Sequence, residues 1–349
     1  MALRRRSCNS GIGGQAVLEG IMMKNKDKYA VAVRKPDGEI EVDIDEFTGT
    51  APNFFLRNVP FFRGIFNFID SLRLGLKAIN YSASFYEDTE ENETRFDKAM
   101  SKVFKGNTER VFTGVVTTIS ILLAVGIFIL LPYYLTKLLS VNVRNETYTA
   151  FIEGAIRLGV FILYVLLISF NRDIKRVYRY HGAEHKCINC IERGKDLTVD
   201  NVMHSSRLHR RCGTSFMIIV ILLSVLLFFF IRIQSPVLKV LLRIALVPVI
   251  AGIAYEIIRF AGSHDNAFSK FLSIPGLLLQ KITTREPDRE MVEVAIVAVE
   301  SVFDWKDFCE THYHEIPANK VRPKEIPPIV IAEDEESKTI LLDNTDDDI

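Results

Sequence analysis

The sequence has few cysteines and no excess of either charge, and both features exclude broad classes of protein. Five cysteines in 349 residues are too few and too scattered for a scaffold held by disulfide bonds. With 43 basic and 43 acidic side chains, the net charge points neither to nucleic acid nor to an acidic substrate. No G-x-S-x-G elbow, P-loop or internal repeat is found, and no cleavable signal peptide is expected, because the arginines at 4–6 precede no apolar core.

Long hydrophobic runs are what the sequence does have. Hydrophobic residues make up 48% of the chain and gather in a few segments, which is typical of a membrane protein. Four segments are long and apolar enough for helices that cross a bilayer, which need about 20 residues. They lie at 113–139, 150–170, 214–233 and 237–260. We therefore expect a mainly α-helical polytopic membrane protein with four transmembrane helices in two hairpins, plus a small β-containing region at the N-terminus.

Basic residues predict the orientation of these helices. The segment 171–213 between the two hairpins carries ten Lys or Arg, and further basic residues precede the first hairpin and follow the second. Because positive charge accumulates on the cytoplasmic side of a membrane, we expect this segment and both termini to lie in the cytoplasm. Thiols stay reduced there and are free to bind metals.

The remaining sequence predicts further parts. In the β-rich region 1–59, two alternating stretches flank Pro36-Asp37-Gly38 and predict a β-hairpin, and 15–23 suggests another strand. The region 60–112 begins with an amphipathic helix over 60–86, either in the membrane interface, which we favour, or in a soluble core, and continues as an acidic connector. After the second hairpin, a cytosolic amphipathic segment is expected at 261–315, with a helix, which we favour, or a buried strand at 290–303. The acidic tail 316–349 is expected to be disordered.

A five-residue motif in the segment 171–213 predicts metal chemistry. In His181-Gly182-Ala183-Glu184-His185, the two histidines are one helical turn apart and share a helix face. Glu184 lies beside the second histidine, where it could take a proton from an attacking water. This is the H-x-x-E-H arrangement of inverted zinc hydrolases. A helical pair of histidines can also be a plain surface or packing feature.

Further nitrogen and sulfur donors follow the motif. His209 and Cys212 come after it, and Cys187 and Cys190 flank it. Zinc takes nitrogen and sulfur ligands at such short spacings. We therefore expect a divalent metal, most plausibly zinc, bound by His181, His185, His209 and Cys212, with Cys190 as a further candidate.

Several segments, most of them outside this motif, have distinctive amino-acid sequences. They include Gly13-Gly-Gln-Ala-Val-Leu-Glu-Gly-Ile-Met-Met23, Tyr180-His-Gly-Ala-Glu-His-Lys186 and Ser206-Arg-Leu-His-Arg-Arg-Cys-Gly-Thr-Ser-Phe216. Others lie at 251–256, 275–276 and 279–287. In amino-acid sequence and in their order along the chain, they resemble the YqhQ-like family of bacterial membrane proteins. The resemblance covers nearly all residues from 11 to about 303.

This resemblance implies a protein of the bacterial inner membrane and conveys little about its reaction. The family is a domain of unknown function sometimes labelled a predicted metal-dependent enzyme. Its pattern usually has proline where this chain has Arg210, which leaves His209 and Cys212 in place but puts the turn geometry in doubt. At Cys187 the pattern tolerates other residues, so we do not count that cysteine as a ligand.

The sequence leaves two kinds of metal site open. If all four predicted ligands bind, the sphere is closed and the metal is structural. If one is absent, a position remains for water, and Glu184 would act as general base. We prefer the open site, because Glu184 has an evident role only there.

Other charged residues are candidates for supporting roles. Glu256 would pair with Arg259 one turn away, or would instead reach the metal as an oxygen ligand or accept a hydrogen bond from a ligating histidine. Glu19 is either a contribution of the N-terminal region to the same site or a surface residue. Glu153 and Arg157 have the spacing of an i,i+4 ion pair. The glycines at 11, 13 and 14 suggest a close backbone approach rather than a phosphate-binding loop.

The sequence as a whole favours a metal-dependent hydrolase at the cytoplasmic surface of the membrane. The expected substrate is a membrane protein segment, a peptide or a lipid, because the site would lie beside the interface. The alternative is a non-enzymatic membrane factor whose closed metal site shapes a surface for protein partners. A transporter ranks third, because the spans contain few central polar residues of the kind that mark ion paths.

Overall fold

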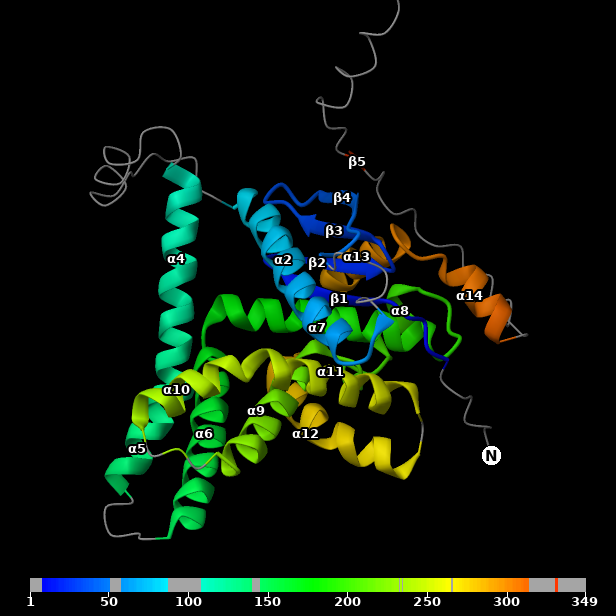
Figure 1. Cartoon of the computed structure of the whole chain (residues 1–349). Coiled ribbons are helices and arrows are strands. Elements are labelled where there is room, and N and C mark those ends of the chain that lie inside the picture. The colour runs from blue at the N-terminus through cyan, green and yellow to red at the C-terminus, as the bar shows by residue number, and fades with distance from the viewer. Residues whose placement is uncertain are drawn as a thin grey trace, which may run out of the picture.

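The structure is a computed structural model that describes residues 8–50, 58–86, 108–139, 145–231, 233, 235–264, 266–313 and 330–331. This part of the chain is mainly helical and has one small sheet near its N-terminus, as the sequence predicts (Figure 1). Helix α7 (Arg172–Ile191) runs between the sheet and a group of long apolar helices (Figure 1). The expected acidic connector at 87–93, and the expected disordered tail apart from 330–331, lie outside the described residues.

The sheet consists of short strands in chain order, and the first four are antiparallel. They are β1 (Gly13–Val17), β2 (Gly20–Asn25), β3 (Lys28–Arg34) and β4 (Ile40–Glu46), and the two-residue β5 (Val330–Ile331) pairs with β4 in parallel. The hairpin expected around Pro36-Asp37-Gly38 is confirmed as β3–β4, with Gly38 at a φ of 91°. The single strand expected at 15–23 is wrong. The chain reverses at Leu18 and Glu19 and forms two strands, β1 and β2, and Glu19 takes a φ of 50°.

Helices cover both faces of the sheet. One face packs Ile21 and Met23 against α7 and α13 (Arg289–Glu300). The opposite face packs Met22 and Val31 against Leu74 of α2 (Phe62–Ser84). Because side chains alternate along a strand, the continuous apolar run of β3 serves both layers. The helix favoured at 290–303 is thereby confirmed as α13, and it is buried along most of its length.

Helix α2 confirms the amphipathic helix expected over 60–86. Its Gly64 packs closely against Gly252 of α11 (Val247–Ser263), where an added Cβ would lie 2.9 Å from the Gly252 carbonyl oxygen. Its outer face carries Leu72 and Leu76, each 52% exposed. One face of α2 is therefore core, and placement of the outer face in the membrane interface stays a prediction.

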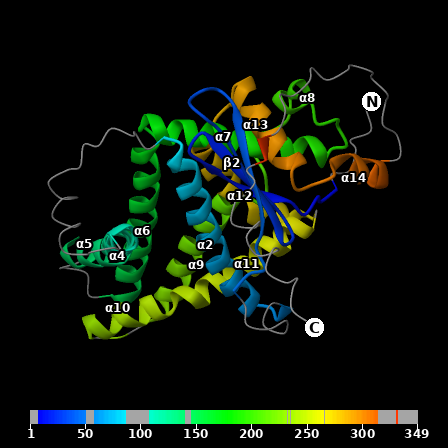
Figure 2. The same cartoon turned by 90° about the horizontal axis from the view of Figure 1, so that it is seen from above.

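Within the described residues, three helical stretches are long and apolar enough to cross a membrane. They span Gly114–Leu139, Thr147–Ile168 and Val237–Ser263. The first joins α4 (Thr108–Val125), the π-helical η1 (Gly126–Leu130) and α5 (Leu131–Leu139), the second is α6 (Glu146–Ile168), and the third joins α10 (Pro236–Ala245) to α11. Figure 2 shows α4, α5, α6 and α10 gathered on the side of the molecule away from the sheet.

The fourth expected span is shorter than the sequence suggests. The apolar run at 214–233 forms α9 (Gly213–Phe229), a helix of 17 residues. Such a helix is about 25 Å long, against a hydrocarbon core of about 30 Å. It is also packed among α6, α11 and α12 (Ala267–Thr283). The count of four spans is therefore not confirmed, although the apolar helices themselves are.

Segments from both sides of α9 hold α7 in place. The chain between α7 and α9 forms α8 (Val199–Met203) and a loop, and the last helix of the described chain is α14 (Trp305–His312). In α12, the buried Gln280 donates to the His209 carbonyl at 2.8 Å and accepts from the His209 amide at 2.9 Å. After α12 the chain crosses α7 at Gly182, where an added Cβ would lie only 1.9 Å from the Arg285 carbonyl oxygen. Close packing on α7 therefore requires a glycine inside the motif.

Gly182→Ala tests this packing. The methyl group would meet rigid backbone, so we expect a loss of about 1–3 kcal/mol in the free energy of unfolding. Gly159→Ala in α6 is the control, because nothing lies within 4 Å of its added Cβ and alanine favours a helix. Thermal unfolding of both variants in detergent measures the effect. Equal unfolding midpoints for the two variants would contradict the close contact.

Candidate metal centre

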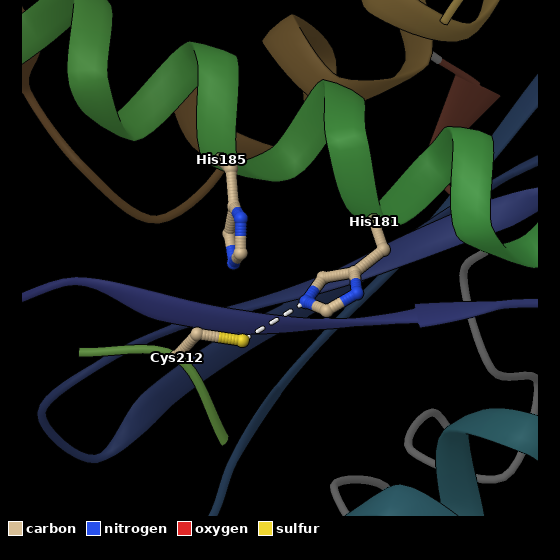
Figure 3. Close-up of side chains that lie close together, drawn as sticks. All are labelled: His181, His185 and Cys212. Carbon is tan, nitrogen blue, oxygen red and sulfur yellow. Dashed lines mark hydrogen bonds between the residues drawn. The ribbon is translucent and has the colours of Figure 1, made fainter. Parts of the chain in front are cut away.

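Helix α7 brings the two motif histidines onto one face. Asn171 caps the helix, with its side chain accepting from the amides of Asp173 and Ile174. The rings of His181 and His185 lie 4.4 Å apart between centroids and point to the same side of α7 (Figure 3). The i,i+4 spacing predicts this arrangement, and the structure agrees with it.

Cys212 meets these rings from the start of α9. It is the N-cap residue of α9, and its Sγ accepts from the Thr214 amide at 3.3 Å. The same sulfur lies 3.1 Å from Nε2 of His181 (Figure 3). One donor atom from each of His181, His185 and Cys212 lies within 4.8 Å of the others. A helix N-terminus favours negative charge, so this position suits a thiolate ligand.

Backbone carbonyls fix which nitrogen each histidine offers. Nδ1 of His181 lies 2.9 Å from the Thr283 oxygen, and Nδ1 of His185 lies 2.7 Å from the Arg207 oxygen. A carbonyl only accepts, so each Nδ1 carries the proton and each Nε2 keeps its lone pair. Metal-binding histidines are oriented in this way. Burial also lowers the pKa of His185, which keeps its ring neutral. The donor set and its supports therefore fit a zinc ion.

The buried carboxyl group of Glu184 lies against the sheet. Burial raises its pKa, while the electrostatic interaction with His181 and a hydrogen bond from the Gly14 amide lower it. Its Oε2 has no hydrogen-bond partner in the described part of the chain. A Cβ on Gly14 would lie 3.2 Å from the Glu184 carboxyl carbon and 2.6 Å from the Met22 oxygen. The glycine here permits a close approach, as the sequence suggests.

His209 lies beside the cluster but is engaged elsewhere. Its ring centroid is 5.7 Å from that of His185, and its Nε2 is 3.4 Å from Oε2 of Glu192. Glu192 also binds Arg211 and accepts from the Ser10 hydroxyl at 2.9 Å. Burial would raise the pKa of Glu192, but the hydrogen bond from His209 and the charges of His209 and Arg211 hold it at about 2. A metal-ligand role for His209 stays a prediction.

Glu192 is a buried charged residue near the cluster that the sequence analysis missed. It is 2% exposed and lies seven residues after His185, a spacing that returns to the same face of a helix. That spacing is the signal that would have found it.

The three supporting candidates lie in other surroundings. Glu19 binds the Arg176 guanidinium and accepts from the Tyr180 hydroxyl at 3.3 Å, so it ties the β1–β2 turn to α7. Glu256 binds Arg63 of α2 through both oxygens, so the expected partner Arg259 is not its main one. Cys190 is buried in the core between the sheet and α13, where burial raises the pKa of its thiol to about 12.

The segment after α12 completes the surroundings of the histidines. The Arg207 guanidinium donates to the Thr284 oxygen at 2.5 Å and to its hydroxyl at 2.9 Å. Glu286 pairs with Lys186 at 2.8 Å and with Arg207 at 3.3 Å. The loop before α9 and the segment after α12 are thereby joined to each other and to α7. Both carbonyls that orient the histidines belong to this frame.

Comparison with known proteins identifies the family of the chain. The family model described as "Protein of unknown function (DUF1385)" matches residues 59–305. The chain is also 36% identical over 286 residues to "Uncharacterized protein YqhQ" of Bacillus subtilis (strain 168), an alignment that covers 81% of this chain and 89% of the relative. No solved structure matches the chain. Neither description states an activity, and the chain belongs to the DUF1385 family of proteins of unknown function.

Proposed function

We propose that this protein is a hydrolase of the bacterial inner membrane that binds one divalent metal ion, for which zinc is the first candidate. His181, His185 and Cys212 would hold the ion. The observation that carries the proposal is the convergence of their three donor atoms within 4.8 Å. The two Nδ1–H groups are already used by carbonyls, which leaves both Nε2 atoms directed to the same place.

The number of protein ligands favours a catalytic metal over a structural one. Catalytic zinc sites use three protein ligands, whereas structural sites use four. His209 is held at Glu192, which favours the three-ligand set. A bound zinc ion supplies Lewis-acid polarisation of the reacting group.

Glu184 is the residue that we assign to proton transfer. It lies one residue before His185 and close enough to His181 to interact with it electrostatically. One carboxyl oxygen has no partner within the described residues and is free to accept a proton from water. The Gly14 amide holds the carboxyl group in position. Glu184 would therefore act as the general base in attack on an ester, amide or phosphoester bond.

The position of the site relative to the apolar helices suggests the substrate. Helix α7 begins at Arg172, four residues after the end of α6 at Ile168, and Cys212 directly precedes α9. Cys212 thus lies at the start of one apolar helix, and the helix that carries both histidines begins close to the end of another. Such a site would lie at the membrane surface, on the cytoplasmic side by the distribution of basic residues. A membrane protein segment, a peptide or a lipid is the expected substrate.

Burial of the cluster supports a second candidate function. His185 is 1% exposed and Cys212 is 6% exposed, as structural zinc ligands commonly are. In this alternative the metal stabilises the junction of α7 and α9 as a surface for a protein partner, and Glu184 has no chemical role. Variants at Glu184 distinguish the two functions.

The predicted topology follows from the role of α9. If α9 crosses the membrane, there are four spans and both termini lie in the cytoplasm; without it there are three, and the termini lie on opposite sides. The test fuses one of two reporters to each terminus. A fluorescent protein is fluorescent only in the cytoplasm, and alkaline phosphatase is active only on the outer side of the membrane. We expect fluorescence and no phosphatase activity at both ends. Phosphatase activity at one terminus alone would contradict four spans.

Metal content tests the ligands. The protein purified in detergent should contain about one equivalent of zinc by elemental analysis. His181→Gln, His185→Gln and Cys212→Ser should each lose most of it, because each removes one of three ligands. His209→Gln is the matched control and should keep it. Less than a tenth of an equivalent of zinc, iron or manganese in the unchanged protein would end the proposal.

Glu184→Gln tests catalysis separately from metal binding. The amide has the same shape but accepts no proton, so zinc content should be unchanged while activity falls by roughly 10²–10⁴-fold. Activity is read as complementation of a strain that lacks the protein and as cleavage of ester, amide and phosphoester reporters. Glu290→Gln makes the same change at an exposed position of α13 and serves as the control. Full activity of Glu184→Gln would favour the structural alternative.

A further inference from the structure

A group of buried charged residues lies among the apolar helices, remote in sequence from the metal site. Glu153 and Arg157 are on α6 and Arg243 is on α10, within two of the three candidate membrane spans. They are 6%, 3% and 1% exposed, respectively. Charged residues inside a membrane protein are costly and usually mark a functional site. The i,i+4 pair expected from the sequence is thus confirmed, but with a third member.

The group carries one positive charge too many. Oε1 of Glu153 lies 3.0 Å from Nη2 of Arg157 and 2.5 Å from Nη1 of Arg243, so one carboxylate serves two guanidinium groups. Among the described side chains of α5, α6, α9 and α10, Glu153 is the one carboxylate. Among the described residues, the surroundings therefore compensate for only part of the positive charge of the two arginines.

The group also has too few hydrogen-bond acceptors. Nε of Arg157 and both Nε and Nη1 of Arg243 are buried without a hydrogen-bond partner in the described structure. The Nη1 contact with Glu153 is therefore electrostatic and lacks hydrogen-bond geometry. Buried N–H groups without acceptors are rare in proteins, and a bound ion or water commonly satisfies them.

Aromatic side chains enclose the two guanidinium groups. The Phe228 ring lies 4.6 Å from the Arg157 guanidinium carbon and 5.1 Å from that of Arg243. Tyr133 lies 5.8 Å from the latter. Ring faces attract cations but carry no net charge and accept hydrogen bonds only weakly. They leave both deficits in place and limit the size of any further occupant.

We propose that Arg157 and Arg243, with Glu153 between them, bind one small monovalent anion of the halide class, most plausibly chloride. A single negative charge balances the two cations and the carboxylate, and the same ion accepts from the unpartnered N–H groups. The burial of all three residues disfavours a phosphate or a lipid headgroup, which would need a wide opening. This proposal is independent of the metal centre.

Chloride binding to the whole protein in an uncharged detergent tests the proposal. Chloride replaces gluconate at constant ionic strength, and the unfolding midpoint and the binding of radioactive chloride are measured. The unchanged protein should bind one chloride per chain and should become saturably more stable. Glu153→Gln leaves two uncompensated cations and should bind chloride at least tenfold more tightly. Arg243→Gln leaves a neutral pair and should lose saturable binding.

Lys137→Gln in α5 is the matched control. It removes an exposed positive charge from the same group of helices and should keep the chloride dependence of the unchanged protein. If Arg243→Gln does not fold, the comparison of Glu153→Gln with the unchanged protein still decides. Absence of saturable chloride binding in both the unchanged protein and Glu153→Gln would overturn the proposal. An equal loss of chloride binding in Lys137→Gln and Arg243→Gln would also overturn it. The same holds if phosphate stabilises the protein, more strongly in Glu153→Gln, while chloride has no effect.

Discussion

The two hydrogen bonds from Nδ1 of His181 and His185 to backbone carbonyls are the constraint on which the candidate site depends. Both acceptors lie outside α7: the Thr283 oxygen is at the end of α12, and the Arg207 oxygen is in the loop before α9. Those segments are held in turn by the hydrogen bonds of Gln280 to the backbone of His209. The packing of apolar helices therefore determines the orientation of two imidazoles. Helix α7 also contacts β1 of the sheet, where Gly14 lies against the Glu184 carboxyl group.

Much of the candidate site could be predicted because its spacing is local. Two histidines four residues apart share a helix face wherever the helix packs, and Cys212 follows closely enough to reach them. Other positions depended on tertiary contacts that no spacing reveals. His209 lies in the expected loop, but its side chain is engaged by Glu192, while Glu256 finds its partner in α2, 193 residues earlier in the chain.

The fold was predictable to a similar degree and for a similar reason. Hydrophobic runs and alternation identified the helices and the β3–β4 hairpin, whose glycine marks the turn. The β1–β2 turn was missed because Leu18 and Glu19 lack the residue types that usually signal a reversal. The length of α9 was overestimated because apolar composition continues past the point where the helix ends, at Phe229. Arg243 joins the Glu153–Arg157 pair only through the packing of α10 on its neighbours.

X-ray absorption at the zinc edge tests the central claim most directly, because it reports the donor atoms around the ion without knowledge of the substrate. With His181, His185 and Cys212 as ligands, the spectrum should show imidazole nitrogens at about 2.0 Å and one sulfur at about 2.3 Å. The sulfur shell should disappear in Cys212→Ser. A first shell of nitrogen and oxygen alone in the unchanged protein, or a sulfur shell that persists in that variant, would contradict the account.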